Sequence, residues 1–185
     1  MTQLTKKAIV NSFIKLLNDK PWDKITVKDI VEDCGINRNT FYYHFADIRE
    51  LTRFTLDSQI KSVMQVNPSI DSWVDSFIEA AKFALENKRA VYHLYNSVSR
   101  EILENYLSVV AYGVMDSFIE MKAVGMKVRE FDKKLLKEFY KGALVGMVCS
   151  WLEGDMKQDP EAAINRLGIL LEGAVVTSLK ISENK

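Results

Sequence analysis

Helix-breaking residues are scarce in this chain of 185 residues, which has eight glycines and three prolines. In the long stretches between them, apolar residues recur three or four positions apart, the spacing that gathers side chains on one face of an α-helix. The hydrophobic content of 48% is enough to bury one good core or two small ones. We therefore expect an all-α protein of about nine helices.

The first third of the sequence predicts four of these helices. The first runs from an N-cap at Thr5 to about Asn18, and a long fourth helix begins at the cap pattern Asp47-Ile48-Arg49-Glu50. Between them, residues 26–45 predict a helix, a turn and a second helix. This order indicates a helix-turn-helix unit braced by a helix on either side.

Capping residues mark the ends of the two middle helices. Thr26 followed three residues later by Asp29 has the form of a capping box. Gly35 can take the positive φ that closes a helix, and Asn37 is a good N-cap for the short helix that follows.

That short helix has one apolar and one polar face. Phe41 and Phe45 point the same way at 100° per residue, while Asn39 and Tyr43 point outward. Amide and phenol groups can hydrogen-bond base edges and phosphates, so DNA is the first candidate partner. The alternative is an aromatic-rich bundle helix without a ligand.

The rest of the sequence predicts five longer helices and no repeat or flexible linker. One is capped by Ser69 and contains Trp73 and Phe77. The others span about 88–95, 99–125, 130–154 and 159–180.

Charge and composition restrict the possible partners. The formal net charge is zero, and the first 55 residues hold nine basic and seven acidic side chains. Affinity for phosphate must therefore come from the placement of cations rather than from bulk charge. The sequence has no 18-residue apolar run and no signal-peptide pattern, so we expect a cytoplasmic protein that does not contact a membrane.

An enzyme is the least favoured class. The two histidines, His44 and His93, and the two cysteines, Cys34 and Cys149, give no metal-ligand spacing and no nucleophile with a base. We expect no catalytic residue, metal or cofactor, and we expect both cysteines to be buried reduced thiols.

The first 55 residues resemble the DNA-binding domain of the tetracycline-repressor (TetR) family of bacterial regulators. The resemblance rests on Thr26-Val27-Lys28-Asp29-Ile30, on Cys34-Gly35-Ile36-Asn37-Arg38-Asn39-Thr40-Phe41-Tyr42-Tyr43-His44-Phe45, and on Glu50-Leu51. It implies that Thr26 and Lys28 contact the DNA backbone, with a base as the alternative, and that Asn37 is one of the DNA-binding residues. Arg38, Asn39 and Thr40 would face base edges. Tyr42, Tyr43 and His44 would hydrogen-bond phosphates.

The start of the fourth helix departs from the family pattern. Members often carry lysines where this chain has Ala46 and Ile48. Arg49 is expected to substitute as a phosphate contact, and the loss of two cations would weaken DNA binding and flatten its salt dependence.

The resemblance also implies a homodimer with a DNA-binding domain at residues 1–50 and a ligand-binding and dimerisation domain at residues 51–185. Aromatic and methionine side chains could line the effector pocket, although an ordinary helical core uses the same residues. The pocket candidates are Trp73, Phe77, Tyr92, His93, Tyr95, Tyr106, Tyr112, Met115, Met147 and Trp151.

Small residues on the last two helices predict a close backbone approach, because glycine costs helix stability. In the family these helices build the dimer, and the alternatives are packing within the chain or room for a ligand. The dimer candidates are Gly142, Ala143, Gly146, Gly168, Gly173 and Ala174.

The leading hypothesis is a ligand-responsive transcriptional repressor that binds a palindromic operator in double-stranded DNA and responds to an unidentified small molecule. The second is a regulator that acts mainly through a protein partner, because residues 92–97 resemble relatives linked to dihydroxyacetone kinase operons that act in this way.

Overall fold

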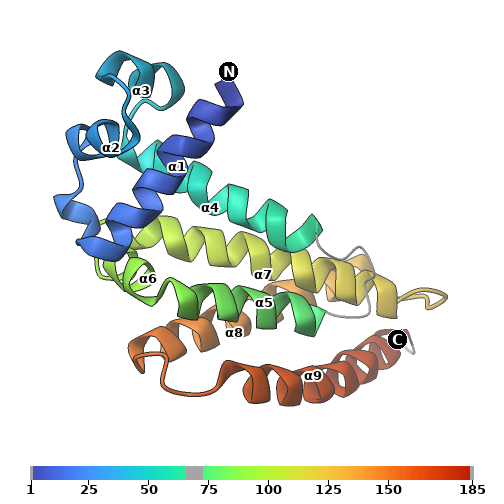
Figure 1. Cartoon of the computed structure of the whole chain (residues 1–185). Coiled ribbons are helices and arrows are strands. Elements are labelled where there is room, and N and C mark those ends of the chain that lie inside the picture. Colours follow the sequence, from blue (N-terminus) through green and yellow to red (C-terminus); the bar gives the residue numbers. More distant parts are fainter. Residues whose placement is uncertain (1, 66–72, 184–185) are drawn as a thin grey trace. The chain divides into compact units, whose positions relative to one another are not determined.

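The computed structural model is all-α, as the sequence predicts. It describes the backbone of residues 2–65 and 73–183 and the side chains of residues 3–58, 74–75 and 77–183. Over these residues it contains nine α-helices, one 3-10 helix and no strand (Figure 1). In chain order they are α1 (Thr2–Asp19), η1 (Trp22–Lys24), α2 (Val27–Cys34), α3 (Arg38–His44), α4 (Ile48–Gln65), α5 (Trp73–Glu86), α6 (Lys88–Tyr95), α7 (Arg100–Lys122), α8 (Glu130–Glu153) and α9 (Pro160–Glu183).

The chain forms two compact units, each with its own hydrophobic core. Unit 1 comprises Met1–Ser62 and Phe83–Tyr106, and unit 2 comprises Val63–Lys82 and Leu107–Lys185. Helices α1, α2, α3 and α6 belong to unit 1, and α8 and α9 belong to unit 2. Helices α4, α5 and α7 contribute residues to both.

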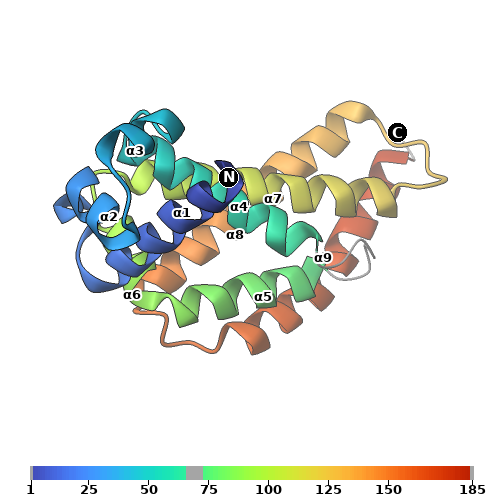
Figure 2. The same cartoon turned by 45° about the horizontal axis from the view of Figure 1, so that its top comes forward.

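The core of unit 1 joins α6 to the four N-terminal helices. Ile9 and Phe13 of α1 are fully buried together with Phe41 of α3 and Leu51 of α4, and Ala90 of α6 belongs to the same cluster. Figures 1 and 2 show α6 at the C-terminal half of α1, along which it packs. Burial of these side chains supplies the main stabilisation of the helix-turn-helix unit.

Polar groups of α6 also bind the C-terminal end of α1, where the last carbonyl groups of a helix lack partners within the helix. Arg89 donates a hydrogen bond to the Asp19 carbonyl oxygen at 3.3 Å. The Nδ1 atom of His93 lies 2.6 Å from the Leu17 carbonyl oxygen. Helix α6 therefore caps α1 as well as packing against it.

The core of unit 2 is built from α7, α8 and α9. Met115 and Ile119 of α7 and Val175 and Leu179 of α9 are fully buried, and α8 adds Leu144. Phe77 of α5 packs against the same cluster.

An ion-pair network links α7 to α8 in unit 2. The Lys137 Nζ atom lies 2.6 Å from Asp116 Oδ1 and 2.5 Å from Glu120 Oε1, and the Lys133 Nζ atom lies 3.0 Å from Glu120 Oε2. Burial of Lys137 disfavours its charge, but the hydrogen bonds to both carboxylates outweigh that effect and raise its pKa. The hydrogen bonds from Lys137 and Lys133 lower the pKa of Glu120. The lysine is thus charged and paired, as a buried ammonium requires.

The outcome differs at three of the predicted helix starts. Helix α1 begins at Thr2, so Thr5 lies inside it and the predicted cap there is wrong: the preceding residues contain no breaker and continue the helix. Ser99 precedes α7, yet its buried hydroxyl has no hydrogen-bond partner among the described residues. The predicted cap at Ser69 lies outside the described residues.

Candidate nucleic-acid interface

The start of α2 is fixed by the predicted capping box. The Asp29 N–H donates to Thr26 Oγ1 at 3.2 Å, and the Thr26 N–H donates to Asp29 Oδ2 at 2.7 Å. Hydrogen bonds from Thr26 and then Lys20 lower the pKa of Asp29 to about 2, from 3.8. The stabilisation from this ionised carboxylate is complete above pH 4 and is lost as the pH falls through about 2.

The turn between α2 and α3 follows the sequence prediction at both of its key residues. Gly35 has φ of 68° and ψ of 31°, a left-handed conformation that glycine adopts without steric cost. Asn37 is the N-cap of α3, and its Oδ1 atom accepts hydrogen bonds from the Thr40 N–H at 2.8 Å and the Thr40 hydroxyl at 3.0 Å. The side chains of Asn37 and Thr40 therefore fix the direction of α3.

Helix α3 buries one face and exposes the other. Phe41 is fully buried, and the Phe45 that follows α3 is almost fully buried. Tyr42 is 54% exposed and Tyr43 is 78% exposed. Among the described residues, the exposed Arg38 has no hydrogen-bond or ion-pair partner, so its guanidinium group is available to a ligand.

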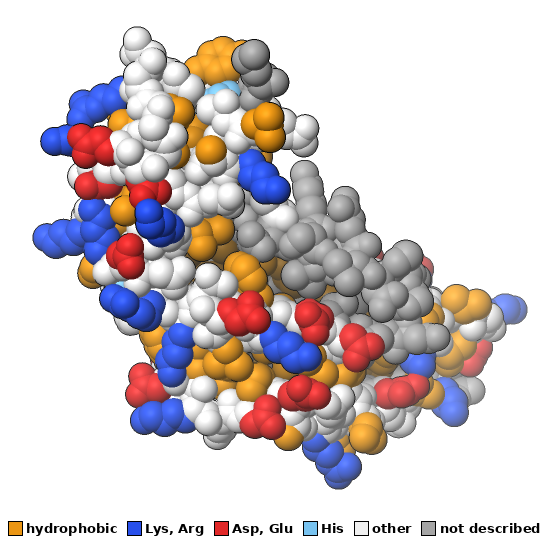
Figure 3. Space-filling model, in the orientation of Figure 1, with side chains coloured by type: hydrophobic (Ala, Val, Ile, Leu, Met, Phe, Trp, Pro, Cys, Tyr) orange, Lys and Arg blue, Asp and Glu red, His pale blue; other side chains and the backbone are white. Residues whose placement is uncertain are grey.

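Figure 3 shows the same surface from outside. The end of unit 1 that carries α3 displays mainly apolar and uncharged polar side chains, with lysine or arginine and acidic side chains at its margin. Such a surface suits contact with bases and phosphates through hydrogen bonds and a few placed cations.

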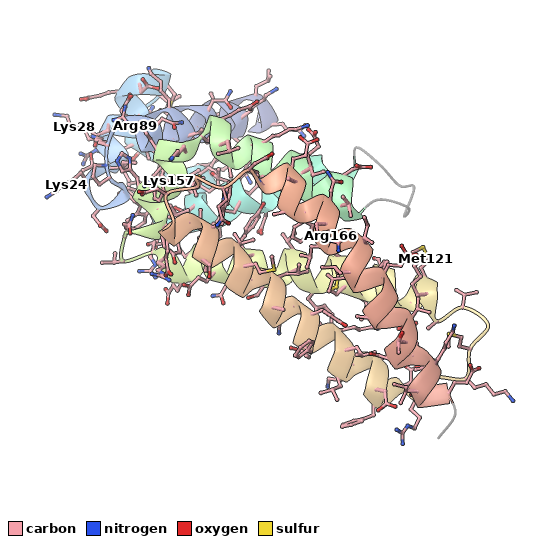
Figure 4. All side chains as sticks on the ribbon, turned by 90° about the horizontal axis from the view of Figure 1, so that it is seen from below. Lys24, Lys28, Arg89, Met121, Lys157 and Arg166 are labelled. Atoms are coloured by element: carbon pink, nitrogen blue, oxygen red, sulfur yellow. The ribbon has the colours of Figure 1, made fainter. Side chains whose placement is uncertain are left out.

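Two cations predicted to contact the DNA backbone, Lys28 and Arg49, have partners within the chain. Arg49 is paired with the Glu101 carboxylate at the start of α7. The Lys28 Nζ atom lies 3.7 Å from Glu32 Oε1, and both side chains are about 65% exposed. Figure 4 shows Lys28, Lys24 and Arg89 at the same end of unit 1. Pairing with a carboxylate opposes the use of these cations by DNA.

The sequence did not point to Lys6 of α1. Its Nζ atom lies 5.6 Å from the ring centre of Phe45 and 4.9 Å from that of Phe54. These partners are about 40 and 50 positions away in the sequence, so no local pattern could have revealed the arrangement.

The pocket candidates are divided between the two units. In unit 1, His93 contacts the Leu17 carbonyl oxygen at 2.6 Å, and the hydroxyl of the buried Tyr95 accepts a hydrogen bond from Arg100 at 2.5 Å. Tyr92 is half-buried there beside Lys88. Burial of Tyr106 raises its pKa to about 12.

In unit 2, Met115 is fully buried, Phe77 packs beside the core, and Tyr112 is half-buried. Met147 is 47% exposed, and the Trp151 indole N–H donates to the Gln158 carbonyl oxygen at 3.0 Å. The Trp73 side chain lies outside the described residues. A shared ligand pocket remains a prediction.

Helices α8 and α9 run alongside each other and expose apolar side chains (Figure 4). The large ones are more than half exposed, except Met147 at 47%; they are Phe131, Leu135 and Phe139 of α8 and Ile169, Leu170 and Ile181 of α9. We define the apolar surface of α8 and α9 as Phe131, Leu135, Phe139, Ile169 and Leu170, together with the exposed small residues Gly142, Ala143, Gly146, Gly173 and Ala174. The sixth small-residue candidate, Gly168, is buried within the chain.

Among the described residues, the space beside the Cα atoms of the glycines on this surface is open. A Cβ atom added at Gly142, Gly146 or Gly173 would meet no described atom within 4 Å. The fold of one chain therefore does not require glycine at these positions.

By length and mean hydropathy, α9 is the one described helix that could cross a membrane. Only 17% of its most apolar 18-residue window is buried within the chain. Of its large exposed apolar residues, Ile169 and Leu170 belong to the apolar surface of α8 and α9, where a protein partner accounts for them equally well, and Ile181 lies outside that set.

Two family models cover most of the sequence. The model described as bacterial regulatory proteins of the tetR family matches residues 9–53. The model described as a transcriptional regulator C-terminal region matches residues 71–173.

Individual relatives are more distant. A stretch of 85 residues is 25% identical to the HTH-type dhaKLM operon transcriptional activator DhaS of Lactococcus lactis subsp. lactis (strain IL1403), covering 46% of each protein. The match thus spans about half the length of this relative.

Solved structures share the fold over nearly the whole chain. A structure of the dihydroxyacetone kinase operon activator DhaS has a TM-score of 0.71 at 18% identity, covering 97% of this chain and 98% of that one. Native NalD, the secondary repressor of the MexAB-OprM multidrug efflux pump in Pseudomonas aeruginosa, has a TM-score of 0.59 at 16% identity, covering 90% and 94%. Together with the capped helix-turn-helix of unit 1, the two family matches show that the chain belongs to the TetR family of transcriptional regulators and is not an enzyme.

Proposed function

We propose that this chain is a ligand-responsive repressor that binds a palindromic operator as a homodimer. Residues 1–50 would bind the DNA, and residues 51–185 would bind the effector and form the dimer. The observation that carries the proposal is the exposed face of α3, where Arg38, Asn39, Tyr42 and Tyr43 project from a helix fixed by caps at its start and by buried phenylalanines beneath.

The side chains on this face suit different parts of the duplex. The guanidinium group of Arg38 can pair with O6 and N7 of guanine, and the amide of Asn39 can pair with N6 and N7 of adenine. The phenols of Tyr42 and Tyr43 can donate to phosphates and so set the position of the helix in the groove.

The apolar surface of α8 and α9 supports the dimer. Glycine inside a helix costs about 1 kcal/mol relative to alanine, and the environment of Gly142, Gly146 and Gly173 within one chain requires no glycine. A second copy whose backbone approaches closely would make use of the missing side chains. Exposed phenylalanine and leucine on the same surface would be removed from water by the same contact.

In a dimer, a bound ligand can control the affinity for the operator. Two copies of α3 in a symmetric dimer must match half-sites one helical turn apart. A small molecule that binds better to a dimer with another separation of the recognition helices shifts the population away from the DNA-binding form. The differential affinity of the ligand for the two forms then sets the loss of operator affinity.

Variants of α3 test the proposal. In fluorescence anisotropy with DNA from upstream of its own gene, Arg38→Ala should weaken binding roughly 5- to 150-fold and relax the preference for one base pair. Tyr43→Ala should weaken binding equally across sequences, because phosphates are the same at every site. Lys157→Ala, an exposed cation of unit 2, is the control. Unchanged affinity for both α3 variants would rule out this surface.

A reporter experiment determines whether the chain represses or activates transcription. NalD is described as a repressor and DhaS as an activator. With the promoter fused to a reporter, removal of this chain should raise expression. A fall in expression would replace repression by activation.

A second candidate is a regulator that acts mainly through a protein partner. The pairing of Arg49 with Glu101 and of Lys28 with Glu32 favours it, since fewer cations of the helix-turn-helix unit are free for phosphate. The purified chain would then show no salt-dependent binding to its upstream DNA below physiological salt. Clear binding of the chain alone would exclude this candidate.

A further inference from the structure

We propose that Lys6 of α1 is a DNA phosphate contact, which extends the nucleic-acid interface beyond α2 and α3. The inference rests on the proposed DNA-binding function and adds a residue to the same surface. Figure 1 shows the start of α1 and α3 at the same end of unit 1.

Two aromatic rings hold the Lys6 ammonium group beside the end of α3. Phe45 is the C-cap of α3, and its ring lies 5.3 Å from that of Phe54, at 62° to it. The Lys6 Nζ atom lies 5.6 Å and 4.9 Å from the two ring centres. A cation at such a distance is attracted by the negative face of the ring.

The Phe45 ring lies on the buried side of α3, and contacts between neighbouring rings lead from it to the exposed face. From Phe45, ring contacts continue to His44 at 6.4 Å and from His44 to Tyr43 at 5.0 Å. Tyr43 is the most exposed aromatic residue of α3. Lys6 thus adds a cation to a row of side chains that reaches the predicted phosphate contacts.

Lys6 also keeps its charge available. Elsewhere in unit 1, Lys15 pairs with Asp33 at 2.5 Å and Lys20 with Asp29 at 2.9 Å. Among the described residues, no carboxylate lies within ion-pair distance of Lys6. Aromatic rings position an ammonium group without neutralising it, so less side-chain freedom is lost when a phosphate binds.

The test replaces Lys6 by methionine, which retains most of the alkyl chain against the rings. Because a dimer has two copies, Lys6→Met should flatten the slope of log affinity against log salt by about 1.8 and weaken binding roughly 10- to 60-fold at 0.1 M salt. Lys6→Arg keeps the charge and should keep the slope. Lys15→Met is the matched control, since it removes one cation from the same helix where the cation is already paired.

The outcomes separate this inference from the proposed function. Wild-type binding with an unchanged slope in Lys6→Met would overturn the phosphate contact and leave the proposed function standing. Weaker binding of Lys6→Met with an unchanged slope would assign Lys6 a packing role and also overturn it. Absence of salt-dependent DNA binding by the wild-type chain would overturn both. The thermal melting temperature of each variant, measured by circular dichroism, shows that the folded protein is being compared.

Discussion

The exposed face of α3 and the apolar surface of α8 and α9 are both uncovered in the single chain, but their chemistry is opposite. On α3 the exposed groups are a guanidinium, an amide and two phenols. On α8 and α9 they are aromatic and aliphatic side chains with glycines between them. Water satisfies the first set, whereas exposure of the second set costs free energy.

This difference separates two kinds of association. Binding through placed cations and hydrogen bonds weakens as salt screens the phosphates. Binding through apolar side chains changes little over the same range of salt and depends on close packing. We therefore expect operator affinity to depend strongly on salt and dimer affinity to depend on it weakly.

The largest expected effect comes from charging the apolar surface. Phe139 is 66% exposed in the single chain. In Phe139→Arg, an unpaired charge would enter the dimer contact, and operator affinity should fall at least about 100-fold because the chain becomes a monomer. Sedimentation analysis measures the mass and anisotropy measures the DNA binding.

Val124→Arg is the control for this variant, because Val124 is exposed in the turn after α7, apart from the apolar surface. A dimer that persists in Phe139→Arg would show that α8 and α9 do not form the interface.

The sequence predicted the elements of this comparison unequally. The cap of α2, the left-handed Gly35 and the cap Asn37 are local features, set by residues at most four positions apart, and the structure confirms them. The pairing of Arg49 with Glu101 spans 52 positions, and the sequence contains no signal for it. Packing between distant segments creates such contacts, and local periodicity carries no information about them.

The burial of Lys137 shows the same limit in unit 2. A lysine in a helical pattern is expected on the solvent side, since lysine is rarely buried without a partner. Here two carboxylates of α7 supply the partners, and only the packing of α7 on α8 brings them together.

A smaller effect should follow from freeing Arg49. In Glu101→Gln the guanidinium group loses its carboxylate partner and becomes available to phosphate. An exposed ion pair is worth about 0.2–1 kcal/mol, so operator affinity of the dimer should rise roughly 2- to 30-fold. Its salt dependence should become steeper in the same titration.

Glu104→Gln is the matched control, because Glu104 lies on the same helix and pairs with Arg100 at 2.7 Å. Equal affinity of Glu101→Gln and the wild-type protein would show that Arg49 does not reach the DNA.

The smallest effect distinguishes close packing from mere apolar contact. Gly146→Ala should stabilise the monomeric helix by about 1 kcal/mol, while the added methyl group separates the two copies and raises the dimer dissociation constant. Thermal unfolding at several protein concentrations measures both. If the variant were more stable as monomer and dimer alike, the glycine would not lie at a close backbone approach.

Helix α6 limits how far the DNA-binding part can be treated as a separate module. It lies in the second segment of unit 1, Phe83–Tyr106, far along the chain from the helix-turn-helix. Even so, it supplies Ala90 to the core of unit 1 and binds the last carbonyl groups of α1 through Arg89 and His93. A chimera that joins residues 1–62 to another regulator would leave that face of α1 uncovered. To transfer the operator preference intact, the graft must carry residues 83–106 as well.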